Sequence, residues 1–149
     1  MSEIRLEAVG TADRAPWAAL WRDYLTFYGT AMRDDVYNAA FAQIMSDDPA
    51  SFQARLAWRD ETAIGLVQWV WHPHLWHPSQ GVVYMQDLYV APSARGAGIG
   101  GRLIRAVFAD ADARGAADVY WLTQYGNPAR LLYDGMGERT DFVKYKRRA

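Results

Sequence analysis

The sequence has no cysteine, only two lysines and no long apolar run. The absence of cysteine excludes disulfides, thiolate zinc sites, iron–sulfur clusters and a cysteine-linked acyl intermediate. No apolar stretch approaches the roughly 18 residues that cross a bilayer, and residues 1–5 lack the basic-then-apolar layout of a signal peptide. With 16 basic and 17 acidic side chains, the net charge of −1 gives no field that attracts nucleic acid. We therefore expect a cytoplasmic protein with no membrane or nucleic-acid partner.

The length and composition predict one globular domain over residues 1–149. A chain of 149 residues is about one domain long. Its 51% apolar and 14% aromatic content excludes disordered, collagen-like and low-complexity classes. No internal repeat, linker or biased segment divides the sequence.

Hydrophobic periodicity predicts a mixed α/β (α+β) fold in the order β-α-α-β-β-β-α-β-α-β. The expected strands cover residues 4–8, 52–59, 63–71, 82–90, 118–123 and 142–147. The expected helices cover residues 17–28, 36–44 and 99–114, and a last helix opens at Asn127-Pro128 and ends near Gly135–Gly137. The three middle strands form an antiparallel meander, because their connections are too short for crossovers.

A glycine-rich turn, Arg95 to Gly101, lies between an expected strand and an expected helix. Glycines let backbone N–H groups turn inward and approach an anion without obstruction by a Cβ atom. The helix N-terminus adds unpaired donors and about half a positive charge, and Arg95 and Arg102 can add charge-assisted contacts. The turn therefore predicts a diphosphate site, with a merely tight strand–helix turn as the alternative.

Gly96, Gly98 and Gly101 also match the dinucleotide fingerprint, but their context argues against it. That fingerprint follows the first strand of a parallel βαβ unit, and its acidic residue closes the next strand. Here the turn follows three antiparallel strands, and Asp118 stands at the start of the next strand. The Gly-Lys-Ser/Thr of a P-loop occurs nowhere.

The segment Asp87-Leu88-Tyr89-Val90-Ala91-Pro92 and the turn after it resemble the acetyl-CoA-binding motif of the GCN5-related N-acetyltransferases (GNAT). That motif reads Arg/Gln-x-x-Gly-x-Gly/Ala after a strand ending Leu-Tyr-Val-x-Pro, and Arg95, Gly98 and Gly100 occupy its positions. The likeness continues through residues 119–123, Asn127 and Leu132-Tyr133. Within the family, Tyr120-Trp121 and the closing residues 140–147 are most similar to the fungal histone-and-polyamine acetyltransferase branch.

The resemblance implies the acyl-CoA N-acyltransferase fold, acetyl-CoA as co-substrate, no metal and an amine acceptor. It implies that the end of the strand and the turn bind acetyl-CoA, through Leu88, Tyr89, Val90, Arg95, Gly96, Ala97, Gly98, Ile99, Gly100 and Gly101.

Transfer of an acetyl group from a thioester to an amine needs a deprotonated amine, a stabilised carbonyl oxygen and a proton for the departing thiolate. An alkylammonium of pKa near 10.4 is about 0.1% neutral at pH 7.4, a cost of roughly 4 kcal/mol. The resemblance implies Tyr133 as the general acid, with simple packing as the alternative. It also implies a backbone N–H of the Leu88–Val90 strand as oxyanion donor, beside a family strand bulge.

The general base is open at the level of sequence. Polyamine-type relatives often carry Glu where this chain has Gln86, which cannot accept the proton. The role then falls to Asp87, to a water chain, or to an acid such as Asp34 or Asp35, and Asp87 can instead be structural. Strand alternation predicts that Gln86 and Asp87 point to opposite faces, so that only one of them lines the pocket.

Other residues have two interpretations each. Asn127 stands six residues before Tyr133, where the family usually has seven, so it either contacts the cofactor or only caps the last helix. Tyr24 and Tyr28 have the spacing of core residues, but the first two helices wall the acceptor site in this fold, where aromatic rings suit an alkyl cation. His72, His74 and His77 lie in a loop that Pro73 and Pro78 splay, which favours a surface role or a place at the substrate mouth over zinc.

We therefore predict an acetyl-CoA-dependent N-acetyltransferase that works by direct attack in a ternary complex. The expected acceptor is a small amine such as a polyamine or amino acid, bound by Tyr24, Tyr28 and Gln86; a protein lysine or N-terminus is the alternative acceptor. The rival from another class is a non-catalytic acyl-CoA sensor or assembly module. A homodimer is expected, because the final strand lies near a sheet edge.

Overall fold

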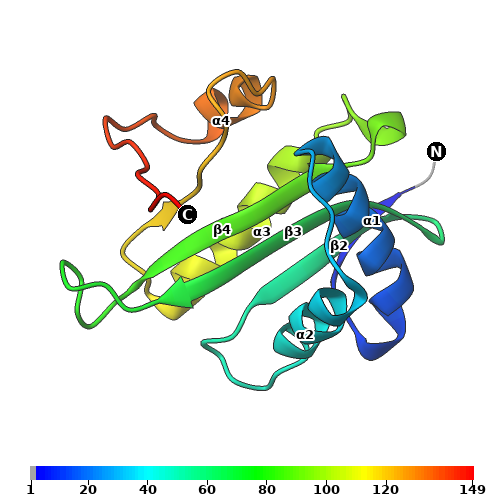
Figure 1. Cartoon of the computed structure of the whole chain (residues 1–149), viewed down its shortest axis with the longest axis horizontal. Helices are drawn as coiled ribbons and strands as arrows, with labels where there is room; N and C mark the ends of the chain where they lie inside the picture. The colour runs from blue at the N-terminus through cyan, green and yellow to red at the C-terminus, as the bar shows by residue number, and fades with distance from the viewer. Residues whose placement is uncertain (1–2) are drawn as a thin grey trace.

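A computed structural model describes residues 3–149 and shows one five-stranded sheet with helices on both faces (Figure 1). The strands are β1 (Ile4–Ala8), β2 (Gln53–Arg59), β3 (Thr62–His72), β4 (Val82–Val90) and β5 (Val119–Tyr120). The helices are α1 (Arg14–Phe27), α2 (Asp34–Ile44), α3 (Ile99–Arg114) and α4 (Arg130–Met136), with short 3-10 turns at Thr11–Asp13 and Pro92–Ala94. The mixed α/β fold class predicted from the sequence is confirmed.

The strands follow one another across the sheet in the order β1-β2-β3-β4-β5. The first four are antiparallel neighbours, as the short connections require, and β5 pairs parallel to β4. That last pairing is brief, because only Val83 with Val119 and Tyr84 with Tyr120 are partners. Beyond Tyr84, the β5-side edge of β4 has no strand beside it within the described residues.

Alternating residues of the central strands divide the core into two layers. Val67, Trp69, Val83 and Met85 pack under α3 on one face. Leu56 and Leu66 pack on the opposite face against Trp17, Trp21 and other residues of α1 and α2. Figure 1 shows α1 and α2 in front of the sheet and α3 behind it, so both faces of the central strands are covered.

Helix α3 has the bounds that its apolar stripe predicts, because a glycine in the left-handed region stands at each end. Gly98 precedes it at φ 75° and Gly115 follows it at φ 71°. A residue with a Cβ atom is disfavoured at such angles by about 1–2 kcal/mol. The first helical bond runs from the N–H of Arg102 to the carbonyl of Gly98, so the N-terminal amides of α3 face the glycine turn.

Three sequence-based expectations near the C-terminus are wrong. The last helix begins at Arg130 rather than at Asn127-Pro128, because residues 127–129 form a turn. The strand expected at 118–123 keeps only Val119–Tyr120. Residues 142–147 form no strand in the described chain, since the short β5 offers no long edge to pair with.

No helix among residues 3–149 is both long enough and apolar enough to cross a membrane.

Candidate active site

The unpaired edge of β4 is the centre of the candidate site. The N–H of Ala91 donates to the carbonyl of Ile64 on β3, at 2.8 Å. Because successive residues of a strand direct their N–H groups alternately to either side, Leu88 and Val90 direct theirs to the open edge and Tyr89 directs its own to β3. The edge therefore presents a free backbone donor at Leu88, inside a pocket that Leu88 helps to line.

The glycine turn continues this edge and has unused backbone donors. None of the N–H groups from Gly96 to Gly101 donates a hydrogen bond within the described residues. Gly96 and Gly98 have φ of 87° and 75°, and a Cβ atom built on either meets nothing within 4 Å. Unpaired N–H groups at a helix N-terminus, with open space in front of them, fit the diphosphate of a coenzyme A molecule.

The other residues of the turn have distinct positions. Ile99 is 2% exposed and belongs to the core, so only its backbone is available to a ligand. A Cβ atom at Gly100 would lie 2.8 Å from Cδ2 of Leu132, so this glycine allows α4 to pack on α3. Ala97 is exposed and Gly101 is buried.

Arg95 contacts the end of the open edge of β4. Its Nε donates to the Val90 carbonyl at 3.0 Å, and its guanidinium lies 5.8 Å from the centre of the Tyr89 ring. No other hydrogen bond of the Arg95 side chain occurs within residues 3–149. Its Nη atoms are therefore available to an anion at the turn.

A β-bulge at Gln86 overturns the expectation that Gln86 and Asp87 point to opposite faces. Gln68 of β3 pairs with Asp87, but the next residue, Trp69, pairs with Met85, so Gln86 is the extra residue. A bulge breaks the two-residue alternation. As a result, the Gln86 Nε2 donates to Asp87 Oδ2 at 3.2 Å, and both side chains lie on the α1 side of the sheet.

Asp87 is one of two buried polar side chains of the described core, at 6% exposure, and the other is its partner Gln68. The Trp17 Nε1 donates to Gln68 Oε1 at 2.7 Å. Because this bond fixes which end of the amide faces Asp87, the Gln68 Nε2 donates to Asp87 Oδ2, also at 2.7 Å. The carboxyl group is thus held by two glutamine amides.

Burial raises the pKa of Asp87 above its ordinary value, and hydrogen bonding from Gln68, Tyr24 and Gln86 partly opposes that rise. The pKa of Tyr24 is also raised, first by burial and then by the charge of Asp87 and a hydrogen bond to it. The Trp21 indole N–H also favours the charged carboxyl, but it lies outside normal hydrogen-bond geometry and has no hydrogen-bond partner among residues 3–149. A carboxyl group whose pKa is raised is better suited to accept a proton.

A pocket beside the open edge brings most of the predicted catalytic and substrate residues together. It is lined by Tyr24, Tyr28, Met85, Gln86, Leu88, Trp121, Leu122 and Tyr133. Asp87 does not line it, but Tyr24 does, and the Tyr24 hydroxyl faces the Asp87 carboxyl. The Tyr24 hydroxyl therefore connects the pocket to the buried Asp87 carboxyl.

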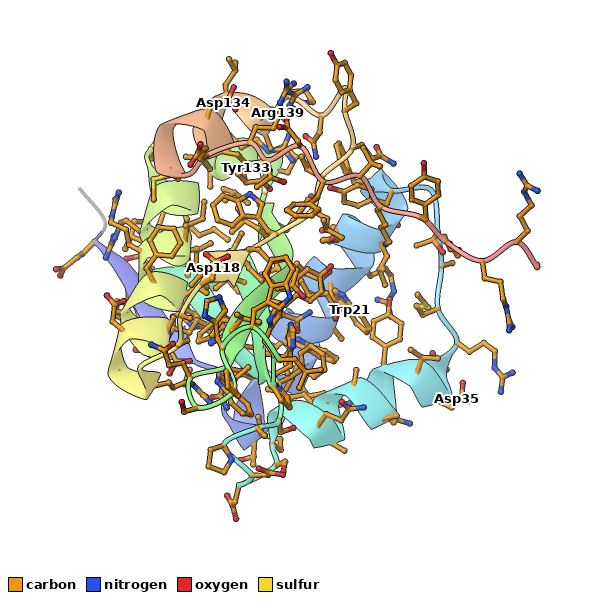
Figure 2. The ribbon with its side chains drawn as sticks, turned by 90° about the vertical axis from the view of Figure 1, so that its left-hand side faces the viewer. Trp21, Asp35, Asp118, Tyr133, Asp134 and Arg139 are labelled. Atoms are coloured by element: carbon orange, nitrogen blue, oxygen red, sulfur yellow. The ribbon has the colours of Figure 1, made fainter. Side chains whose placement is uncertain are left out.

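Tyr133 reaches this pocket from α4. Figure 2 shows it on the side of α4 that faces the sheet, whereas Asp134 lies on the outer side. Its ring packs edge-on to Trp121, with centroids 5.7 Å apart, and its hydroxyl makes no hydrogen bond within the described residues. Burial, with a smaller contribution from Tyr28, raises the pKa of Tyr133 to about 12, so the hydroxyl keeps its proton at neutral pH.

Asn127 links the turn before α4 to Tyr28, the residue that follows α1. Its Oδ1 accepts from the Ala129 N–H at 2.9 Å, and its Nδ2 donates to the Tyr28 hydroxyl at 3.0 Å. It stabilises the turn before α4, although the helix itself begins three residues later. Both ends of its amide are occupied, which fits a structural role and leaves contact with the cofactor as a prediction.

A second hollow, an open groove of about 170 Å³, lies between the sheet and the helices α1 and α2. It is lined by Trp21, Ala40, Gln43, Ile44, Phe52, Gln68 and Gln86. Gln86 lines both the pocket and the groove, so the two hollows meet at the bulge.

The remaining candidates lie apart from the pocket. The exposed Asp35 pairs with Arg33 at 2.9 Å, and Figure 2 places it well away from Tyr133. His72 shares a 2.8 Å hydrogen bond with the Tyr120 hydroxyl, and His74 accepts from the Trp76 N–H. No group of three or more His, Asp or Glu side chains suited to a metal ion occurs in the part of the chain that the structure describes.

Sequence reasoning missed Gln68, Trp121 and the groove. Gln68 has a recognisable signal, because it is the one amide in the apolar run 63–71. A polar side chain in a strand buried on both faces requires a partner. Trp121 and the groove depend on contacts between distant segments, for which the sequence pattern has no signal.

Comparison with known proteins agrees with this geometry. Residues 15–137 match the family described as the acetyltransferase (GNAT) family. The chain is 39% identical over 147 residues to the D-amino-acid N-acetyltransferase HPA3 of Saccharomyces cerevisiae, covering 97% of this chain and 90% of the relative. It is 34% identical to the uncharacterized N-acetyltransferase YhfO of Bacillus subtilis, covering 95% of each.

A solved structure shares the fold. The aminoglycoside N-acetyltransferase AAC(6')-Iy in complex with CoA superposes with a TM-score of 0.84 at 22% identity, covering 99% of this chain and 96% of that one. The family match spans most of the sequence, and two relatives above 30% identity cover nearly all of it. The chain therefore belongs to the acetyltransferase (GNAT) family and is an acetyl-CoA-dependent N-acetyltransferase.

Proposed function

We propose that this enzyme acetylates the amine of a small free molecule by direct attack within a ternary complex. The observation that carries the proposal is one pocket in which the free Leu88 N–H, the Tyr133 hydroxyl and the path to Asp87 meet. The absence of cysteine supports direct attack, because no thiol is available to carry the acetyl group.

The cofactor is proposed to bind along the open edge of β4. The N–H groups of Gly96–Gly101 and the Nη atoms of Arg95 would hold its diphosphate, and the backbone edges of Leu88 and Val90 would hold the arm that leads to the pocket. When bound, it supplies an acyl group activated as a thioester. The backbone of Tyr89 faces β3, so we expect this residue to contribute through its side chain only.

The proton of the acceptor ammonium is proposed to leave through Tyr24 to Asp87. Tyr24 lines the pocket and Asp87 does not. The Tyr24 oxygen accepts the proton from nitrogen while its own proton passes to the Asp87 carboxylate, so no tyrosinate accumulates. The raised pKa of both groups supports this coupling, because neither holds its charge easily in this buried place.

Tyr133 is proposed to protonate the departing sulfur, and the Leu88 N–H to stabilise charge on the carbonyl oxygen. With a pKa of about 12, transfer from Tyr133 to a thiolate of pKa about 8.5 is uphill by roughly 5 kcal/mol. We propose that the Tyr133 oxygen takes up the second amine proton as its own proton leaves for sulfur, so that no phenolate remains.

The acceptor is proposed to be an amino acid or a similar small amine. The relative HPA3 is named for D-amino acids, and its 39% identity supports placing this chain in the same fungal branch. The short open groove next to the pocket suits a small molecule better than an extended protein segment.

We also propose that the whole chain acts as one cytoplasmic domain and forms a homodimer. Phe142, Val143 and Tyr145 are 82%, 73% and 92% exposed, although they are apolar or aromatic. A partner strand would cover them, and sedimentation at two protein concentrations tests this.

The test of the function is an amine panel with two readouts, release of free thiol from acetyl-CoA and the mass of the acetylated amine. We expect thiol release that depends on an amine and equals the product formed. Tight binding of acetyl-CoA without thiol release for any small amine would instead support the acyl-CoA sensor.

A further inference from the structure

The groove beside the pocket has no charged residue in its lining. Three glutamines, Gln43, Gln68 and Gln86, provide its polar atoms, and Trp21, Ala40, Ile44 and Phe52 provide its apolar surface. We propose that this groove binds the tail of the acceptor and selects uncharged, largely apolar tails over tails that end in a second ammonium. This inference rests on the proposed function, because it assigns a specificity to the same site.

The position of the groove fits a tail whose amine lies in the pocket. Gln86 is the residue that the two hollows share. Because the bulge turns Gln86 to the α1 side, its amide separates the reacting nitrogen from the groove without closing either hollow. An acceptor with its amine at Leu88 and Tyr24 therefore directs its substituent towards α2.

The groove wall is closely packed without a ligand. The Trp21 ring stacks on Trp17 with centroids 5.3 Å apart, and it meets Tyr37 edge-on at 5.2 Å. Trp21 is 7% exposed and Tyr37 is 4% exposed, so neither ring is free to move aside. A preformed apolar wall binds an apolar tail with little cost of ordering.

The lining of the groove disfavours a polyamine. A distal ammonium would lose water on entering and find only neutral amides and apolar side chains along the lining. Asp87 is hydrogen-bonded beneath Gln86 and Gln68 and does not line the groove. Asp35 at the start of α2 is exposed and paired with Arg33. The lining thus contains no carboxylate to hold a second cation.

The first experiment compares primary monoamines of increasing chain length with terminal diamines of equal length. We expect kcat/KM for the monoamines to rise about fourfold per methylene until the groove is filled. Each diamine should be at least tenfold poorer than the monoamine of its length. A kcat/KM that does not change with monoamine chain length, or a higher kcat/KM for diamines, would overturn the groove assignment while leaving the acetyltransferase function intact.

Two substitutions in the groove, Gln43→Glu and Ala40→Trp, and one control outside it, Gln80→Glu, test the same point on the folded enzyme. Gln43→Glu places a carboxylate in the lining, at an exposed position of α2 that tolerates charge. We expect the diamine-to-monoamine ratio of kcat/KM to rise two- to fivefold, the range of a partly exposed ion pair. Gln80→Glu makes the same change at an exposed site in the β3–β4 loop and should leave the ratio unchanged.

Ala40→Trp fills the groove and should lower kcat/KM more for long monoamines than for short ones, by at least tenfold in the ratio. Equal losses across the series, or a diamine ratio that Gln43→Glu and Gln80→Glu change alike, would refute the proposal. Absence of acetylation for every amine would refute the proposed function, and the groove assignment with it.

Discussion

Replacing Gln68 by methionine tests whether the buried amide tunes the carboxyl of Asp87. Methionine matches glutamine in length but cannot donate to Asp87 Oδ2 or accept from Trp17 Nε1. Both lost bonds are 2.7 Å long and buried. The substitution therefore removes the first of the hydrogen bonds that keep the pKa of Asp87 from rising further.

The size of the effect follows from the two bonds. A hydrogen bond to a charged group contributes about 1.5–3 kcal/mol, so its loss should raise the pKa of Asp87 by a further 1–2 units. The Trp17 N–H, left without an acceptor, lowers the free energy of unfolding by about 1–3 kcal/mol at any pH. A raised carboxyl pKa favours the neutral form of the folded protein. The free energy of unfolding of the variant therefore falls by about 1.5–3 kcal/mol more above the pKa of Asp87 than below it.

The assay is the pH profile of kcat/KM, followed by thiol release, together with melting temperatures at pH 5 and pH 8. We expect the acidic limb of the profile to move up by 1–2 units and the loss in melting temperature to be larger at pH 8. Trp17→Phe is the matched control, because it breaks only the bond to Gln68 Oε1 and leaves the donor to Asp87 in place. It should destabilise the protein with a much smaller shift of the acidic limb.

A folded Gln68→Met enzyme with the wild-type acidic limb would show that Asp87 does not accept the proton. If Trp17→Phe moved the limb as far as Gln68→Met, the shift would report general destabilisation instead of the lost donor.

Three further substitutions test the other parts of the site. Tyr133→Phe should slow kcat by about 10²–10⁴ with unchanged acetyl-CoA affinity, and full activity of this variant would exclude Tyr133 as the acid. Because the pKa of Tyr133 is about 12, we expect no fall in wild-type kcat from loss of the Tyr133 proton below about pH 11. Gly98→Glu should weaken acetyl-CoA binding at least tenfold by calorimetry. The control Gly115→Glu has similar backbone strain at φ 71° at the far end of α3 and should leave the binding unchanged, so equal affinities of the two variants would refute the diphosphate cradle. Asp87→Asn should lower kcat by about 10²–10⁴. Its melting temperature should exceed that of wild type at pH 8, because the raised pKa makes the ionised carboxyl costly, and this gain should shrink as the pH falls through the pKa of Asp87. A variant that is less stable relative to wild type at pH 8 than at pH 5 would contradict the effect of burial on Asp87.

The sequence predicts well those elements whose signals are local. β4 and α3 have their predicted bounds, Val82–Val90 and Ile99–Arg114. A dense β-branched and aromatic run defines the strand, and left-handed glycines at 98 and 115 define the helix ends. The open glycine turn was likewise predictable, because its geometry depends on adjacent residues, whereas its binding of a diphosphate stays a prediction.

Other features depend on partners that are remote in the chain. The bulge at Gln86 shifts the register of one strand against another, and strict alternation therefore assigned Gln86 and Asp87 to opposite faces. The β-branched and aromatic residues within 142–147 are typical of a strand, but a strand forms only beside an edge that can pair with it. The Trp17–Gln68–Asp87 chain joins α1, β3 and β4, and nothing in each segment alone specifies that they meet.

The most direct measurement is a crystal structure of the enzyme with CoA and the acetylated amine. We expect the diphosphate on the N–H groups of Gly96–Gly101, the sulfur within about 3.5 Å of the Tyr133 hydroxyl, and the acetyl oxygen on the Leu88 N–H. A diphosphate bound elsewhere, or a sulfur far from both Leu88 and Tyr133, would contradict this expectation.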